Sequence, residues 1–274
     1  KGILTMDQPT LLPARRIGPD TDLFCTHVPL PGLGVLPVNA YLIHAREPVL
    51  VDTGIGALRD DFVASLAARM DPADLRWIWL THADADHMGA LRAVMDVAPQ
   101  ARVVTNYLGV GKLGLHQLPL ERTWLLNPGQ ALDVGNRRLL ALRPPVYDAP
   151  ETMALFDTHT RHLFSSDCFG AVLAEAAGSA AEVNSVELRE GLALWATIDA
   201  PWLAQLDRET LAAACLPWRD LRPQRVLSSH LPPAEKIEAL LYSGLESARE
   251  RAPFVGPDQQ AFEQAIRLAE PALA

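Results

Sequence analysis

The segment from Trp77 to Ala90 constrains this chain more than any other, because an apolar run ends there in side chains that can all bind metal. Within six positions the segment carries His82, Asp84, Asp86 and His87. Without a cation, neighbouring carboxylates would repel each other and raise a pKa. A pair of divalent ions removes that repulsion. The segment therefore predicts a metal-binding loop at the end of a strand rather than a solvated acidic turn.

Size, charge and cysteine content narrow the class of protein. The chain has 274 residues, of which 49% are apolar, so it can bury the core of a layered α/β domain. A net charge of −9 without a Lys/Arg cluster predicts no nucleic-acid partner. No stretch approaches the roughly 20 apolar residues of a membrane span. Three widely spaced cysteines indicate reduced thiols, so we expect a cytoplasmic protein with no membrane partner.

Hydrophobic periodicity predicts a sheet flanked by helices. The expected strands are 23–26, 38–43, 48–51, 75–80, 101–105, 131–134, 138–142, 153–156, 162–165 and 225–230. The expected helices are 58–70, 90–97, most of 171–211, 234–251 and 258–273, and the segment 111–127 is expected to be a loop. His159 and His162, in or beside a turn, are expected at the surface.

Further acids and a histidine stand at or near strand ends. Asp167 precedes a glycine, Asp148 lies in a loop held extended by prolines, and His230 is followed by two prolines. Loops at one edge of an open α/β sheet meet in a cleft, so these three residues and the four of the metal loop supply seven ligands for two metals. Asp52, before Thr53-Gly54, is expected either to orient a ligating histidine or to form an Asx turn.

The segment Thr81 to Gly89, with Asp52-Thr53-Gly54 before it, resembles the metallo-β-lactamase superfamily, whose loop runs His-x-[His/Glu]-x-Asp-His. The resemblance implies an αββα sandwich with a dinuclear site at one edge of its sheets, in a single domain over residues 1–274. Within the superfamily the chain is similar to the lactamase-like domain of flavodiiron proteins. That likeness rests on Asn39–Ile43, the acid at position 84, Pro150–Met153 and Leu163–Gly170. The flavodoxin domain of full flavodiiron proteins is not expected in this chain.

The resemblance implies a role for each ligand. One metal would take His82 and Asp84, the other would take Asp86, His87 and His230, and Asp167 would bridge them. Two residues depart from the flavodiiron pattern. Asp84 stands where that branch has Glu, and Asp148 stands where it has His. Asp148 is still expected to touch metal, although Tyr147 or Glu151 could face the cleft in its place. Asp86 and Tyr147 are the expected catalytic residues.

Three histidines with four carboxylates favour iron or manganese, although zinc would also bind. The four negative charges cancel two divalent ions, which favours small neutral substrates such as dioxygen or nitric oxide. The leading hypothesis is therefore a non-haem diiron protein that binds or reduces these molecules, or uses oxygen on an organic substrate. Electrons would come from a separate donor.

Two other functions remain open from the sequence. The first is a metal hydrolase of an ester, lactone, thioester or phosphoester, in which a bridging hydroxide attacks and Tyr147 or Asn106 faces the oxyanion. The second is a degenerate binding scaffold with one metal or none. The Trp-rich region from 195 to 218 is expected either to cover the cleft or to form the contact of a homodimer.

Overall fold

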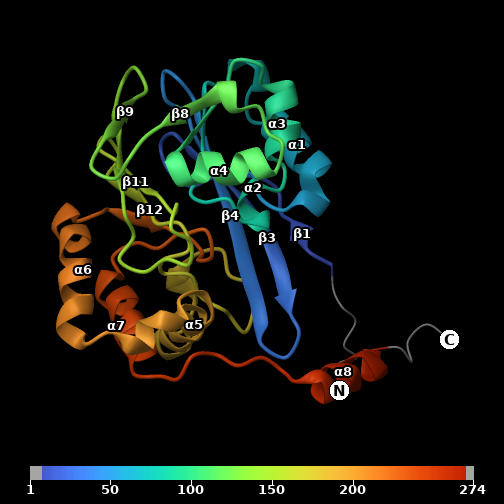
Figure 1. The fold of residues 1–274 in the computed structure, drawn as a ribbon, viewed down its shortest axis with the longest axis vertical. Coiled ribbons are helices and arrows are strands. Elements are labelled where there is room, and N and C mark those ends of the chain that lie inside the picture. The colour runs from blue at the N-terminus through green and yellow to red at the C-terminus, as the bar shows by residue number, and fades with distance from the viewer. Residues whose placement is uncertain (1–7, 270–274) are drawn as a thin grey trace.

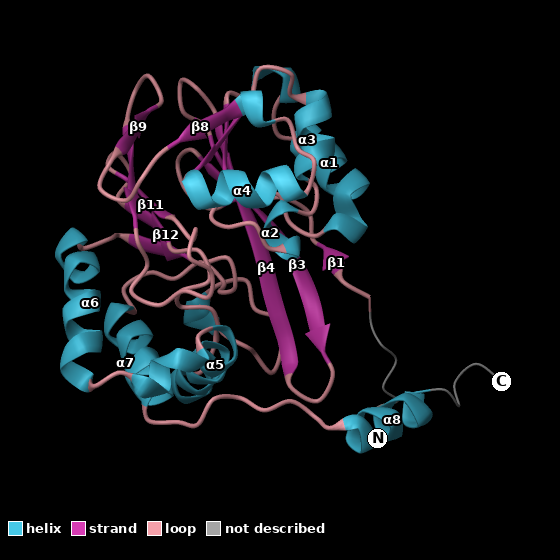
Figure 2. Cartoon of the chain, viewed as in Figure 1, coloured by secondary structure: helices cyan, strands magenta, loops and turns pink. Residues whose placement is uncertain are grey.

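The computed structural model describes residues 8–269, which form two facing sheets with helices on both outer sides (Figure 1). Figure 2 shows the same four layers by type of element. This is the αββα arrangement expected from the sequence, and that expectation is confirmed. The helix α8 (Gln259–Ala269) lies away from the two sheets, and the last residues of the helix expected over 258–273 lie outside the described part.

The larger sheet has the strand order β1-β3-β4-β5-β6-β7-β8, with β2 paired to β3. Its long antiparallel hairpin pairs Thr21 with Ile43 and Leu30 with Gly34. From β5 to β8 the strands run parallel, so their carboxyl ends lie at one edge. The strands are β1 Thr10–Leu11, β2 Arg15–Arg16, β3 Thr21–Leu30, β4 Gly34–Ile43, β5 Val49–Val51, β6 Trp77–Trp79, β7 Arg102–Thr105 and β8 Thr123–Leu125. The helices on its outer face are α1 Arg59–Ala67, α2 Ala85–Met88, α3 Leu91–Val97 and α4 Tyr107–Leu115.

The smaller sheet has the order β13-β12-β11-β10-β9, and β12 and β13 are parallel neighbours. Its strands are β9 Ala131–Asp133, β10 Arg138–Leu142, β11 Ala154–Asp157, β12 His162–Phe164 and β13 Arg225–Leu227. Three helices cover its outer side, namely α5 Ser185–Asp199, α6 Arg208–Leu221 and α7 Glu238–Arg249.

Side chains from both sheets meet in a core between them, where Tyr41, Val51 and Trp79 of the larger sheet lie in one cluster with Leu155 and Phe164 of the smaller. There are two further clusters. One lies between the smaller sheet and its outer helices, and the other lies between the larger sheet and its outer helices. Polar bonds also cross between the sheets. The Trp79 indole donates to the carbonyl of Met153 at 3.1 Å, and the Tyr41 hydroxyl donates to the carbonyl of Ser228 at 2.7 Å. The sheets are therefore locked together beside the strand ends.

Two predicted segments differ from the structure. The expected loop over 111–127 contains the end of α4 and all of β8, because Asn106 caps α4 and Leu113 anchors it in the core despite its glycines. The expected helix over 171–211 begins only at Ser185, since Leu173 is bridged to Val35 of the long hairpin.

Smaller corrections concern the start of one helix and one histidine. The helix expected from Ala234 begins at Glu238, because Ala234 pairs with Val226 as an isolated β-bridge. His162 was expected at the surface and is buried on β12, where burial and the charge of Arg225 lower its pKa to about 4. His159, in the turn, is exposed as expected.

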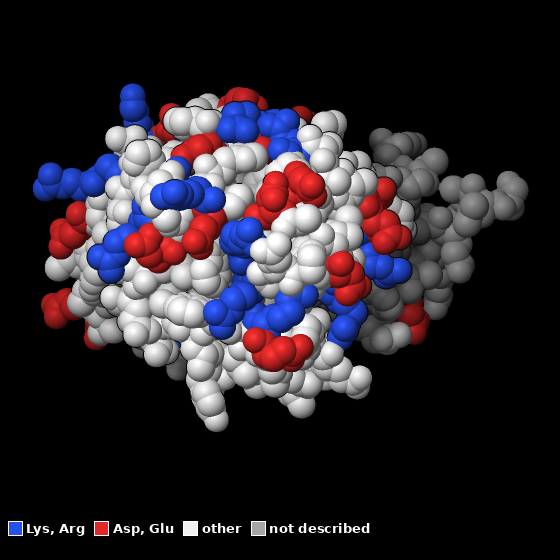
Figure 3. Space-filling view, turned by 90° about the horizontal axis from the view of Figure 1, so that it is seen from above, with Lys and Arg blue, Asp and Glu red and all other residues white. Residues whose placement is uncertain are grey.

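The surface of the described residues carries mixed charge on the face shown in Figure 3, where Lys and Arg side chains lie next to Asp and Glu side chains. Among residues 8–269, no helix combines the length and apolar character needed to cross a membrane.

A buried carboxylate ties the start of the larger sheet to α1. The Asp22 side chain is fully buried and accepts hydrogen bonds from Arg16 at 2.6 Å and from Arg69 at 2.8 and 2.9 Å, with His44 at 2.7 Å. Burial alone would raise the pKa of Asp22, but Arg69, His44 and Arg16 lower it from 3.8 to about 2. Asp22 is therefore ionised in the folded protein at neutral pH.

Replacing this carboxylate should weaken the fold in a pH-dependent way. The folded pKa of Asp22 lies below its unfolded value, so its contribution is complete above pH 3.8 and is lost as the pH falls toward 2. We expect Asp22→Asn to lower the free energy of unfolding by about 2 kcal/mol at pH 7 and by progressively less below pH 4. Denaturant titrations at several pH values measure this. Asp60→Asn, at an exposed site on α1, is the control, and equal effects of the two substitutions would contradict the role of Asp22.

Candidate metal centre

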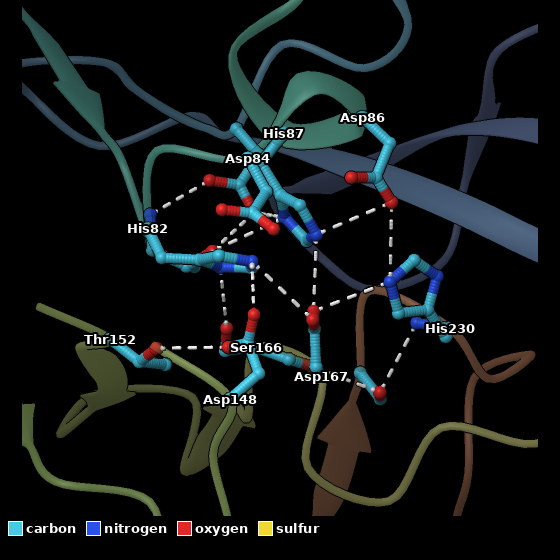
Figure 4. A network of polar contacts seen from close by, with 12 residues as sticks. His82, Asp84, Asp86, His87, Asp148, Thr152, Ser166, Asp167 and His230 are labelled. Atoms are coloured by element: carbon cyan, nitrogen blue, oxygen red, sulfur yellow. Dashed lines mark hydrogen bonds and ion pairs between the residues drawn. The ribbon is translucent and has the colours of Figure 1, made fainter. Parts of the chain in front are cut away.

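Loops from both sheets bring the predicted ligands to one place. The loop after β6 and the short helix α2 carry His82, Asp84, Asp86 and His87. Asp148 lies in the loop before β11, Asp167 follows β12, and His230 follows β13. Figure 4 shows His82, His87 and His230 directed toward Asp167.

Asp52 shapes the metal loop from behind. It follows β5 with a left-handed φ of 57°, and its carboxylate accepts from the backbone N–H of Thr81 at 2.8 Å and from the Thr81 hydroxyl at 2.8 Å. The same carboxylate lies 2.9 Å from Nδ1 of His87. Because a carboxylate accepts there, Nδ1 carries the proton and Nε2 presents its lone pair to the cleft. Asp52 therefore orients a candidate ligand and is not itself in the cleft.

The close approach of α2 to the loop after β5 requires glycine at position 89. A Cβ there would lie 2.1 Å from the backbone nitrogen of Gly56. The Gly89 N–H donates to the carbonyl of Gly54 at 2.9 Å, and the Thr53 N–H donates to the carbonyl of His87 at 2.7 Å. These bonds fix the helix turn that carries Asp86 and His87.

The Asp167 carboxylate is shared between two groups of histidines. Its Oδ1 lies 3.1 Å from Nε2 of His87 and 3.3 Å from Nε2 of His230, and its Oδ2 lies 3.4 Å from Nε2 of His82. Ser166 before it takes a left-handed φ of 55°, and the Trp195 indole donates to the Asp167 carbonyl at 3.1 Å. The two oxygens thus contact different histidines, and the rings of His82 and His87 lie next to each other with centroids 3.9 Å apart.

His230 is held from the larger sheet. Its Nδ1 donates to the carbonyl of Pro37 at 2.9 Å, so Nε2 is directed to the cleft, 3.4 Å from Oδ2 of Asp86. The Asn39 amide donates to the carbonyls of Ser228 at 2.9 Å and Leu231 at 2.8 Å, on either side of His230. Trp195 packs against its ring, with centroids 4.5 Å apart.

The opposite side of the cleft is less firmly held. Among the described residues, the contacts of Nδ1 of His82 are the hydroxyls of Thr81 and Ser166, each at 3.3 Å. Oδ2 of Asp148 lies 3.9 Å from Nε2 of His82, and its other oxygen accepts from Thr152 at 3.4 Å. The Asp84 and Asp148 side chains are 46% and 24% exposed.

The described residues offer two ligand sets. Asp86, His87 and His230 form one and His82, Asp84 and Asp148 form another, with the ligand atoms of each set within 4.8 Å of one another. Asp167 groups with His82 and His87 by the same measure. The structure therefore brings all seven predicted ligands together, and their individual coordination roles remain predictions.

Buried atoms in the cleft are left without hydrogen bonds, which fits cation binding. Nε2 of His82, Nε2 of His87 and Oδ1 of Asp167 are buried and have no hydrogen-bond partner in the described structure. Such orphaned groups are costly unless a ligand or ion satisfies them. Burial alone would raise the pKa of Asp167, but His87, His82 and His230 hold it well below its usual range. The Asp167 carboxylate is therefore ionised.

Sequence reasoning missed one acid in the cleft. The carboxyl of Asp199, the last residue of α5, groups with those of Asp148 and Asp167. Burial, Asp167 and Asp148 raise the pKa of Asp199 to about 9. An acid in the last turn of a helix is unfavourable to the helix dipole, and this was the sequence signal that could have singled it out.

Three other residues considered from the sequence are engaged elsewhere. Asn106 accepts from the N–H groups of Leu108 and Gly109 and donates to the carbonyl of Glu151 at 2.7 Å. The Tyr147 ring packs against Trp202, whose indole donates to the Tyr147 carbonyl at 3.0 Å. The Glu151 side chain is fully buried. Trp195 and Trp202 of the Trp-rich region thus contact loops that carry the site.

The comparison with protein families agrees with this geometry. The family described as the metallo-beta-lactamase superfamily matches residues 33–146, which contain Asp52 and the whole metal loop. This part of the chain is therefore similar to the metallo-beta-lactamase superfamily. Its expected likeness to the lactamase-like part of flavodiiron proteins is also confirmed by the relatives described next.

Curated proteins that are similar to this chain include anaerobic nitric oxide reductase flavorubredoxins. The protein from Aliivibrio fischeri is 29% identical over 220 residues, which are 73% of this chain and 43% of that protein. The protein from Klebsiella pneumoniae is 32% identical over 154 residues, which are 56% of this chain and 32% of that protein. The chain thus spans less than half the length of these relatives.

Solved structures share the fold. Rubredoxin oxygen:oxidoreductase from Desulfovibrio gigas has a TM-score of 0.76 at 18% identity, covering 87% of this chain and 62% of that one. The flavodiiron protein from Giardia intestinalis has a TM-score of 0.72 at 16% identity, covering 88% and 60%. A fragment of diflavin flavoprotein A 5 from Nostoc has a TM-score of 0.70 at 16% identity, covering 89% and 98%.

Removing the shared carboxylate should affect both sides of the cleft. Because Asp167 faces His82 with one oxygen and His87 and His230 with the other, we expect Asp167→Ala to retain at most one metal ion per chain. Elemental analysis after metal loading and gel filtration measures this. Asp133→Ala, at an exposed site on β9, is the control. Two ions retained by Asp167→Ala would refute the bridging role.

Replacing Asp52, which lies behind the metal loop, should weaken metal binding although Asp52 is not a predicted metal ligand. Asp52→Asn removes the charge that fixes the proton of His87 on Nδ1, so we expect metal affinity to fall by about 10- to 100-fold while the ligands stay in place. Competition against a chromophoric chelator gives the affinity, and circular dichroism checks the fold. An unchanged affinity in a folded variant would contradict this role.

Proposed function

We propose that this chain is the metal-binding part of a flavodiiron-like oxidoreductase, in which a dinuclear iron centre reduces dioxygen or nitric oxide. The observation that carries the proposal is the Asp167 carboxylate, whose Oδ1 contacts His87 and His230 and whose Oδ2 contacts His82 at a buried site. An arrangement of this kind suits two cations that share one ligand. The relatives named as nitric oxide reductases and as an oxygen oxidoreductase support the same chemistry.

The donor set supports iron. Three imidazoles and four carboxylates make a harder set than a site of histidines alone, and hard oxygen donors favour iron or manganese among the first-row metals. The charges of Asp84, Asp86, Asp148 and Asp167 together balance two divalent ions. A balanced site has little attraction for anions, which favours small neutral substrates.

At such a centre, different residues of the chain would have different roles. Bound iron would supply open coordination positions and the exchange of single electrons. Asp52 and the carbonyl of Pro37 keep the protons of His87 and His230 on Nδ1, so that both Nε2 atoms stay free for binding. Trp195 shields the His230 side of the cleft from water, since its indole lies on the ring and is tied to the Asp167 carbonyl. The electrons would come from a separate donor.

The contacts of Asn106 favour this function over hydrolysis. A hydrolase needs a free donor at the developing oxyanion. Asn106 is already engaged, because its amide caps α4 and donates to the Glu151 carbonyl. The buried ligand atoms that have no hydrogen-bond partner likewise disfavour a scaffold that binds no metal.

The test compares two metal loadings of the same protein. We expect the iron-loaded protein, reduced and freed of reductant under anaerobic conditions, to consume added nitric oxide or dioxygen while its iron is oxidised. The zinc-loaded protein is the matched control and should consume neither. Gas-selective electrodes and absorption spectra give both readouts. The proposal fails if the iron form leaves both gases untouched, and zinc-dependent ester hydrolysis would then identify a hydrolase.

A further inference from the structure

A lysine from α4 reaches the metal loop. Nζ of Lys112 lies 2.5 Å from Oε1 of Glu151 and 3.8 Å from Oδ1 of Asp84. Burial alone would lower the pKa of Lys112, but Glu151, Asp84 and Asp148 raise it, so the side chain is a cation. The ammonium group thus connects the metal loop to the loop that carries Asp148. It lies on only one side of the cleft, the side of His82, Asp84 and Asp148.

Glu151 gives this lysine a fixed partner. The Glu151 side chain is fully buried, and Oε1 also accepts from the N–H of Ala83, the residue between His82 and Asp84, at 3.3 Å. The Asn106 amide donates to the Glu151 carbonyl at 2.7 Å and caps α4, which sets the helix against this loop. A buried carboxylate is tolerated only when it is paired, and Lys112 is the cation that pairs with it.

The other side of the cleft has different supports. His87 and His230 are buried, and their Nδ1 atoms are held at 2.9 Å by Asp52 and by the carbonyl of Pro37. Both supports belong to the larger sheet, because Asp52 follows β5 and Pro37 lies within β4. By contrast, Nδ1 of His82 has among the described residues only two long contacts, both to hydroxyls at 3.3 Å. Ligands already held in place bind a metal more tightly than ligands that must be ordered.

We propose that Lys112 and Glu151 are positioning residues for one metal only, the one at His82, Asp84 and Asp148, and that this metal is the more weakly held of the two. The inference rests on the proposed dinuclear centre. Glu151 holds the backbone between His82 and Asp84, and Lys112 holds the Asp84 carboxylate, whose side chain is short. Loss of either partner frees Asp84 and leaves Asp86, His87 and His230 unchanged.

The test follows the release of metal into increasing concentrations of a chelator, with metal content measured by elemental analysis. The wild-type protein should release its two ions in two steps. Lys112→Met and Glu151→Gln should release the first ion at about tenfold lower chelator concentration and the second at the wild-type concentration. Lys112→Arg should restore the first step. Lys236→Met makes the same chemical change at an exposed site and should behave as wild type.

Each other outcome is informative. If Lys112→Met shifts neither step, or shifts both equally, the positioning role is wrong and the dinuclear centre stands. If only the second step shifts, the roles of the two sides are reversed and the inference is again wrong. A wild-type protein that never holds more than one ion contradicts the dinuclear centre itself. Thermal melts of the metal-free variants exclude unfolding as the cause, and Lys112→Arg gives a folded comparison if Lys112→Met is unstable.

Discussion

The contact between the Asp167 carboxylate and three buried imidazoles is the interaction on which the rest of this structure depends. His82 and His87 come from the larger sheet, and Asp167 and His230 come from the smaller. The cleft exists only where the two sheets meet at their strand ends. Packing of the sandwich and assembly of the ligand set are therefore one process.

Many hydrogen bonds around the site serve to orient these side chains. Asp52 and Ser166 both take left-handed backbone conformations that non-glycine residues rarely adopt, and both lie beside candidate ligands. Asp52 is held by Thr81 and by the Trp79 carbonyl, and the Asn39 amide binds on both sides of His230. Strain at the site is thus offset by bonds to regular strands, which leaves the ligand atoms preorganised.

Sequence reasoning predicted those parts of the site that neighbouring residues reveal. The metal loop and the strand ends at Asp52 and Asp167 were predicted because apolar strands ending in acids and histidines leave a clear local signal. The four-layer fold was predicted from the resemblance to the metallo-β-lactamase superfamily. Sequence reasoning failed where tertiary contacts determine the local secondary structure. The glycines of α4 disguise a helix that is held by its Asn106 cap and by Leu113, and an Ala-rich segment near Leu173 is kept irregular by its bridge to Val35. Lys112 reaches the site from α4 and Asp199 reaches it from the end of α5, so their roles could not be read from neighbouring residues.

A crystal structure of the iron-loaded protein with anomalous data at the iron edge tests the central claim most directly. The account predicts two iron peaks, one bonded to each oxygen of Asp167, with His82 on one side and His87 and His230 on the other. A structure with full iron loading in solution but no peak beside Asp167, or with Asp167 and His230 turned away from the cleft, would contradict it.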